Sequence, residues 1–300
     1  MRRYRIIFLA LLVIFIAGCS ALRVGYPQAD VILGWRANTY FDLDADQRRE
    51  FSTRLERLLV WHRYEQLPEY AAFLTTAVGK AEPGLKHEDV AWFIEGFRSR
   101  YRTIVNRGAA DAADILATLT PEQIANLQKQ FEKDNRKFVN ERDLDEGVEK
   151  RKRTRLKRMI NQIEDWTGNL TNEQELKVAA LLDPIPLIEH LRHQDRMRRQ
   201  HEFVELLKTR RAQPDFPARL QQWLLAWEHG RAAEYARLSD EVIERRIQFF
   251  MGVEKLLTRE QRQHTLARLQ KFATDCKALS VRPPGRASHE DAGTAILALF

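Results

Sequence analysis

The segment Leu119–Phe138, LTPEQIANLQKQFEKDNRKF, contains the two features that decide the fold. It opens with Thr120 and Pro121, residue types typical of the N-cap and the first position of a helix. Its large apolar residues then recur at helical spacing, as Ile124, Leu127, Phe131 and Phe138. With 3.6 residues per turn these side chains share one face. The segment therefore predicts a capped amphipathic helix that buries its stripe against other helices.

Helical periodicity continues on both sides of this segment, and no run alternates with period two. The stripe Phe51, Leu55, Leu58, Leu59 and His62 predicts a helix that starts at Asp44. We expect an all-α multi-helix bundle over residues 29–279, with a division into two lobes near the basic stretch 145–165. Further helices are expected at 70–78 after an interruption at Pro68, and at 87–106, 109–118, 169–182, 187–211, 217–229, 231–256 and 258–279. Residues 280–300 lack an amphipathic pattern until their last few positions and are expected to be a disordered tail.

The composition excludes several classes of protein. The chain has 300 residues, 44% of them hydrophobic, with 13 Gly, 10 Pro and two Cys. Glycine and proline are too few for a loop-rich β-sandwich or a low-complexity chain. Two cysteines exclude a disulfide-stapled scaffold and a four-cysteine zinc site. The body is expected to be globular, and Cys276 to be a buried, inert thiol.

The N-terminus carries the features of an export signal. Arg2, Arg3 and Arg5 precede twelve apolar residues, 6–17. As a helix these twelve residues span about 18 Å, too short for a hydrocarbon core of about 30 Å. The following Ile16-Ala17-Gly18-Cys19 resembles the bacterial lipobox, which implies cleavage after residue 18 and lipidation of Cys19. The alternative is an ordinary secretory signal in which Cys19 has no such role.

The predicted export signal and lipobox determine the expected compartment and partners. The resemblance implies a signal peptide over 1–18, a lipidated tether over 19–28 and a membrane anchor through the N-terminal lipid. Ser20 stands where an Asp would resemble an inner-membrane retention signal, so we expect the outer membrane and a chain that faces the periplasm. Removal of Arg2, Arg3 and Arg5 lowers the formal charge from +7 to +4. Export also removes nucleic acid as a partner.

A short box recurs four times, as Leu, then Thr or Asp, two residues, and Gln. Its polar members are Asp44 and Gln47, Thr120 and Gln123, Thr171 and Gln174, and Thr258 and Gln261. The unequal gaps between the boxes exclude a regular solenoid. In a capping box the N-cap side chain accepts from the N3 amide while the N3 side chain accepts from the N-cap amide. Each box therefore predicts a helix start.

Four such boxes in an exported, basic helical chain resemble the LTxxQ motif of the periplasmic Spy and CpxP-like family. That resemblance implies an ATP-independent chaperone or an envelope-stress regulator. It covers only the boxes, and that family is half this length with two boxes per chain. A holding chaperone would need an exposed apolar surface with basic rims.

A second resemblance lies in Trp61–Leu74, WHRYEQLPEYAAFL, which is similar to the N-terminal pattern of an uncharacterised family of proteobacterial helical lipoproteins. The resemblance implies the location and no activity. Within this segment Trp61, His62, Arg63 and Glu65 are a candidate polar or interaction site beside Pro68. The alternative is a network of side chains that satisfies a helix end.

A basic run, KRKRTRLKR at 150–158, places seven cations in nine residues. Its cations are Lys150, Arg151, Lys152, Arg153, Arg155, Lys157 and Arg158. In an exported protein such a patch favours anionic lipid headgroups, lipopolysaccharide phosphates, cell-wall carboxylates or acidic proteins. Because Glu146, Glu149, Glu164 and Asp165 flank the run, the alternative is a solvated helix face with ion pairs.

No catalytic motif is present in the sequence, and we expect a binding protein, not an enzyme, without a cofactor. Asp42, Asp44 and Asp46 start like a calcium loop, but its sixth position is Gln47 instead of Gly. His190, His193 and His201 lack a zinc-site spacing. Two functions follow as expectations. The first is a chaperone-like or stress-related module, and the second is an accessory component of envelope assembly that contacts a protein, the cell wall or anionic lipid.

Overall fold

The computed structural model describes residues 21–212 and 215–282, and within these ranges the chain forms helices and loops and no strand. The predicted all-α bundle is confirmed for this part of the chain. Its elements are α2 (Ala21–Gly25), the 3-10 helix η1 (Tyr26–Gln28), α3 (Ala29–Phe41), α4 (Ala45–Trp61), the π-helical turn η2 (His62–Gln66), α5 (Leu67–Ala81), α6 (His87–Ala117), α7 (Pro121–Glu141), α8 (Val148–Thr167), α9 (Asn172–Leu182), α10 (Glu189–Lys208), α11 (Phe216–Leu225), α12 (Ala233–Leu256) and α13 (Arg259–Leu279).

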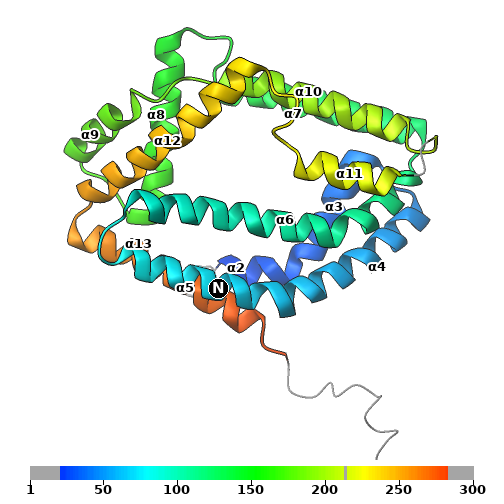
Figure 1. Ribbon diagram of the computed structural model, residues 1–300, viewed down its shortest axis with the longest axis horizontal. Helices are drawn as coiled ribbons and strands as arrows, with labels where there is room; N and C mark the ends of the chain where they lie inside the picture. The colour runs from blue at the N-terminus through cyan, green and yellow to red at the C-terminus, as the bar shows by residue number, and fades with distance from the viewer. Residues whose placement is uncertain (1–20, 213–214, 283–300) are drawn as a thin grey trace, which may run out of the picture.

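The helices form an elongated molecule with α6 across its middle (Figure 1). At one end α8 packs on α9 and α13, and α9 packs on α12. At the other end α3 packs on α4 and α7, while α11 packs on α6. The C-terminal helix α13 runs along α5 and also contacts α2, so helices from the two ends of the described chain lie side by side.

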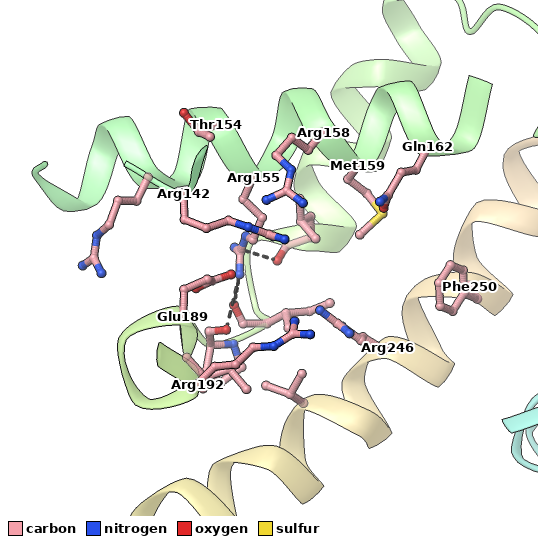
Figure 2. A pocket seen from close by; sticks show the side chains of 16 residues that line it. Arg142, Thr154, Arg155, Arg158, Met159, Gln162, Glu189, Arg192, Arg246 and Phe250 are labelled. Carbon is pink, nitrogen blue, oxygen red and sulfur yellow. Dashed lines mark hydrogen bonds between the residues drawn. The ribbon is translucent and has the colours of Figure 1, made fainter. Parts of the chain in front are cut away.

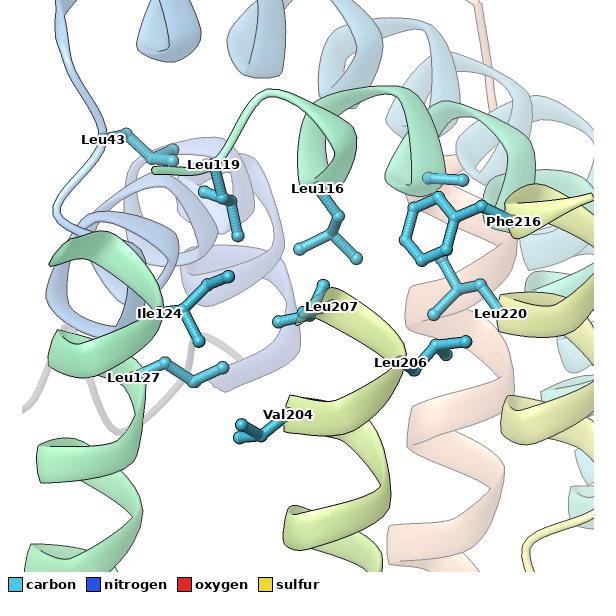
Figure 3. Close-up of a cluster of buried hydrophobic side chains, with 11 residues drawn as sticks. Leu43, Leu116, Leu119, Ile124, Leu127, Val204, Leu206, Leu207, Phe216 and Leu220 are labelled. Atoms are coloured by element: carbon cyan, nitrogen blue, oxygen red, sulfur yellow. The ribbon is translucent and has the colours of Figure 1, made fainter. Parts of the chain in front are cut away.

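The largest core cluster forms where α6 meets α7 and the α3–α4 junction (Figure 3). Leu43 and Leu119, the first residues of two boxes, are 2% and 0% exposed. Around them pack Leu116, Ile124, Leu127, Val204, Leu206, Leu207, Phe216 and Leu220. Burial of each such side chain contributes about 1.5–3 kcal/mol. The box leucines thus fix where the helices turn.

A second cluster lies at the other end, among α8, α9 and α12. It includes Ile163, Val178, Leu182 and Phe249, with the remaining box leucines, Leu170 and Leu257, packed against it. The division into two lobes near 145–165 stays a prediction, and the two clusters do not follow such a boundary along the chain. Most of that stretch is α8, which belongs to this cluster, and the chain after it returns to the first cluster in α10 and α11.

The predicted tether over 19–28 is wrong for the residues that the structure describes. Residues 21–28 are helical, and Leu22 and Tyr26 pack with α5 and α13 against Leu67, Ala71 and Cys276. In addition, Arg23 Nε lies 2.5 Å from the buried Asp275 carboxylate on α13. These contacts order a segment that is expected from the sequence to be a tether.

Two predicted helix ends are absent because tertiary packing overrides the local signal. α6 runs without a break through Gly108, where Leu58 of α4 lies 3.6 Å from the position that a Cβ would take. Pro68 occupies the second position of α5, directly after the π-helical turn. A proline is tolerated in the first turn of a helix, since its missing N–H has no partner there. The helical chain therefore continues from Ala45 to Ala81.

No helix within residues 21–212 and 215–282 is long and apolar enough to cross a membrane. The predicted signal peptide over 1–18, Cys19 and most of the predicted tail over 280–300 lie outside the described residues.

Candidate functional site

All four boxes cap helices. Asp44 accepts from the Gln47 amide at 2.9 Å, and the Asp44 amide donates to Gln47 Oε1 at 3.0 Å. Thr120, Thr171 and Thr258 make the same reciprocal pair with the glutamine three residues on. In the calcium-like stretch, Asp44 is therefore the N-cap of α4, and Asp46 lies in the first turn of that helix.

The boxes also bind one another in two pairs. Gln47 and Gln123 exchange hydrogen bonds of 3.1 and 2.6 Å between their side-chain amides. Gln174 and Gln261 do the same at 2.7 and 3.1 Å. We call each of these pairs a box joint.

Each box joint has the same connectivity. The Nε2 group of every box glutamine also donates to a carbonyl two residues before the partner's N-cap. The bonds are Gln123 to Asp42 (2.8 Å), Gln47 to Thr118 (3.3 Å), Gln174 to Leu256 (2.9 Å) and Gln261 to Asn169 (2.9 Å). Both N–H groups of each amide are used inside the fold. The box joints therefore act as structural clamps that leave little capacity for a ligand.

The candidate site at Trp61–Glu65 falls on the π-helical turn. The His62 Nδ1 and Tyr26 hydroxyl share a hydrogen bond of 2.8 Å, and the His62 ring also packs edge-on against Tyr70. Burial lowers the pKa of His62. Arg63 lies over the Tyr26 ring and Trp61 packs against His62, whereas Glu65 is exposed. His62 and Arg63 contact Tyr26 and so hold η1 onto the bundle, which matches the helix-end alternative.

The basic run separates into two sets on α8. Lys150 pairs with Glu146 at 2.7 Å and Lys152 with Asp183 at 2.9 Å, while Arg153 and Lys157 are exposed. Arg151, Arg155 and Arg158 instead line a cavity. Their spacing of four and three residues places them on one side of the helix.

The cavity has a volume of about 330 Å³. It lies between α8, the loop after α9, the start of α10 and the middle of α12 (Figure 2). Six arginines and one carboxylate, Glu189, line it together with apolar side chains. The arginines are Arg142, Arg151, Arg155, Arg158, Arg192 and Arg246, and the apolar set includes Met159, Leu182, Ile185, Ile188, Val242 and Phe250. We call this the arginine cavity.

The arginines of the cavity differ in the hydrogen bonds that their guanidinium groups form. Arg155 donates to the carbonyls of Leu182 at 3.2 Å and Ile185 at 2.6 Å, so it closes the end of α9. Arg158, Arg192 and Arg246 form no hydrogen bond or salt bridge through their guanidinium groups with any residue of the described chain. Figure 2 shows these three side chains reaching from α8, α10 and α12 toward the same space. They are therefore available to a ligand.

The electrostatics of the cavity favour an anion. Burial lowers the pKa of Arg142, and the charges of Arg158 and Arg192 lower it further. Desolvation by neighbouring atoms, followed by repulsion from Arg192, also lowers the pKa of Arg246, and the charge of Glu189 opposes this shift. The Arg192 and Arg246 side chains are nevertheless exposed to solvent. Glu189 in the lining, together with Asp183 and Glu141 nearby, balances only part of the six guanidinium charges. An oxyanion, such as a phosphate or carboxylate, would relieve the repulsion, and the planar guanidinium fork suits both.

Sequence reasoning missed Arg142, Arg192, Arg246 and Glu189, because they come from three other parts of the chain. The helical spacing of Arg151, Arg155 and Arg158 was the one available signal. The histidines of α10 do not gather: His193 stacks on Phe138, and no group of three potential metal ligands occurs among the described residues. Cys276 is buried as predicted, and burial raises its pKa.

Comparison with known proteins gives one result. A model of a family of unknown function, DUF6279, matches residues 39–236. The matched range contains five of the six cavity arginines and three of the four boxes, but ends before Arg246 and α13. No curated protein and no solved structure matches the chain. Since the matched residues make up about two thirds of the 300, the chain belongs to the DUF6279 family of unknown function.

Proposed function

We propose that this protein is a lipid-anchored component of the bacterial envelope that works by binding an anionic group in the arginine cavity. In this proposal Cys19 carries the lipid, the anchor lies in the outer membrane and the bundle faces the periplasm. It develops the second expectation from the sequence, an accessory protein that contacts anionic lipid or the cell wall.

One observation carries the proposal: Arg158, Arg192 and Arg246 line one solvent-accessible pocket without hydrogen-bonding partners among the described residues. Surface arginines are usually solvated or paired, and three unpaired guanidinium groups in one cavity repel each other. A volume of about 330 Å³ is at the lower end of small-molecule sites. It suits one phosphorylated or carboxylated group, such as a lipid headgroup, a lipopolysaccharide phosphate or a cell-wall carboxylate.

Binding assays on the full chain in non-ionic detergent test this function. Calorimetric titration with inorganic phosphate, glycerol phosphate and a muramyl peptide separates phosphate from carboxylate ligands. We expect the variant with Arg158→Gln and Arg246→Gln to bind the preferred ligand at least about tenfold more weakly, because each charge-assisted hydrogen bond contributes about 1.5–3 kcal/mol.

The matched control carries Arg153→Gln and Lys157→Gln, which remove two exposed charges from the same helix. It should bind like the wild type. If both variants bind the ligand equally weakly, the loss of affinity comes from the lower net charge and not from the arginine cavity. If none of the three ligands binds the wild type, the result contradicts the proposal. Mass measurement of the N-terminal peptide tests the lipid on Cys19 independently.

The second candidate is the chaperone-like function implied by the LTxxQ resemblance. It draws support from large apolar side chains that remain exposed, among them Phe97 at 55% and Phe250 at 44%. Suppression of the aggregation of a reduced client protein, retained by the Arg158→Gln, Arg246→Gln variant, would favour this candidate over the first.

A further inference from the structure

The first helices of the described chain expose an unusual set of apolar side chains. Val24, Val31, Ile32 and Trp35 are 57, 63, 50 and 65% exposed, and Leu33 is 43% exposed. Isolated apolar residues are normal on protein surfaces, but in α3 the spacing of 3.6 residues per turn places Val31, Ile32 and Trp35 on one side, and such an exposed set usually has a partner. We call these three residues the α3 patch.

The patch is not a loosely attached arm. The second half of α3 packs on the first core cluster through Ala37, Tyr40 and Phe41. On its other side, α2 is held by Arg23, which pairs with Asp275, and by Leu22 and Tyr26 in the third cluster. The patch therefore has a set orientation on the bundle, between two points of attachment. At Gly34, next to the patch residues in α3, no atom comes within 4 Å of the position that a Cβ would take.

The position of the patch in the chain indicates what covers it. The described residues begin at Ala21, two residues after Cys19. Two residues span at most about 7 Å, so a lipid on Cys19 would hold α2 against the membrane surface. From Ala21 to Trp35 the helical path is about 21 Å long at 1.5 Å per residue. The α3 patch can therefore reach the bilayer interface if this segment lies along the surface.

The composition of the patch fits that interface. Tryptophan is enriched at the level of lipid headgroups, and an interfacial helix inserts its apolar side chains by about 5–10 Å. Arg36 is exposed beside Trp35, where it can contact lipid phosphates.

We propose that the α3 patch docks on the phospholipid surface and so fixes the orientation of the bundle relative to the membrane. The inference rests on the proposed lipid at Cys19 but does not depend on the arginine cavity. A lipid chain alone would leave the bundle free to tumble on its anchor, whereas a second contact over α2 and α3 would hold it in one pose.

Tryptophan quenching in vesicles tests the docking. The full lipidated chain is reconstituted into vesicles of phosphatidylcholine and phosphatidylglycerol, with or without brominated acyl chains, which quench tryptophans that enter the bilayer. We expect bromolipid quenching in the wild type and a loss of most of it in Trp35→Phe. The control Trp227→Phe removes a tryptophan that is 39% exposed on a different part of the fold, and should retain the quenching.

A second variant, Val31→Ser with Ile32→Ser, should reduce the quenching of Trp35 while the protein still floats with the vesicles. Equal quenching in wild type and Trp35→Phe would overturn the proposal. A dimer that forms without vesicles and disappears in the Val31→Ser, Ile32→Ser variant would also overturn it, because a second copy would then cover the patch. If the protein fails to float with the vesicles and Cys19 carries no lipid, the result contradicts the proposed lipid anchor. If the protein floats but its tryptophans are not quenched, the result contradicts only the docking of the α3 patch.

Discussion

At the scale of single residues, the glutamine of each box both caps its own helix and donates hydrogen bonds to the partner box. A glutamate at the same position could accept from the N-cap amide, but it has no N–H to donate. In the box joints, each glutamine donates both to the partner glutamine and to a partner carbonyl. This explains why glutamine, and not glutamate, suits all four boxes.

We therefore expect Gln123→Glu to lower the free energy of unfolding by about 1–3 kcal/mol, since it leaves buried acceptors without donors and adds a charge. Urea denaturation followed by circular dichroism measures the change. The control Gln128→Glu lies on the same helix at an exposed position and should stay close to wild type. A change in Gln128→Glu as large as that in Gln123→Glu would refute the role of the joint.

His62 leads to a prediction on pH. Because burial lowers its pKa in the folded protein, the unfolded chain binds a proton more readily than the fold does. The contribution of the neutral His62 side chain to stability is therefore fully present when the pH lies above the ordinary histidine pKa of about 6.5. It is lost as the pH falls from there toward the lowered pKa of His62 in the folded protein. Thermal unfolding between pH 7.5 and 5 should show a smaller loss in His62→Gln than in wild type. His201→Gln, an exposed control, should retain the full pH dependence.

At the scale of elements, two glycines inside helices have opposite roles. A Cβ on Gly96 of α6 would lie 2.2 Å from the ring of Phe73 on α5, which also stacks on Phe93 at 5.3 Å. Gly79 of α5 has no atom within 4 Å of its Cβ position. The first glycine thus allows two helices to approach closely, and the second has no contact that requires it.

Substitution by alanine should separate the two cases. Gly96→Ala should destabilise the fold by about 1–3 kcal/mol, because the aromatic cluster has to move. Gly79→Ala should stabilise it by about 0.5–1 kcal/mol through helix propensity. Melting temperatures of the two variants check this, and shifts of the same sign would contradict the packing of α5 on α6 described above.

At the scale of the whole molecule, the Arg23–Asp275 pair joins the first and last described helices. Asp275 has a side chain that is 3% exposed, whereas that of Arg23 is 48% exposed. Loss of Arg23 alone would leave a buried carboxylate without its counter-charge, which costs more than removal of both partners.

We expect Arg23→Met to destabilise the protein by about 1–3 kcal/mol, less than for a fully buried pair because solvent reaches Arg23. Adding Asp275→Leu should restore part of that loss. Chemical denaturation of the two single variants and the double variant forms the required cycle. Strictly additive effects would mean that the pair does not couple the ends of the chain.

Much of the fold followed from the sequence alone, because helix starts and apolar stripes are local patterns. The boxes at Thr120 and Thr258 placed two helix starts within one residue, the helix expected from 169 begins at Asn172, and the stripe through Ile124 and Leu127 identified a buried face. Local signals failed at Gly108 and at residues 21–28, where contacts with Leu58 and with α13 decide the conformation.

The candidate site depended on the tertiary structure. Arg151, Arg155 and Arg158 share a face by helical spacing, but only the packing of α10 and α12 against α8 adds Arg192 and Arg246 to the same space. The pairing of Gln47 with Gln123 likewise spans 76 residues, and nothing in a single box specifies its partner. A sequence determines local conformation through the nearest few residues, whereas a shared cavity arises from the way whole helices bury their apolar faces.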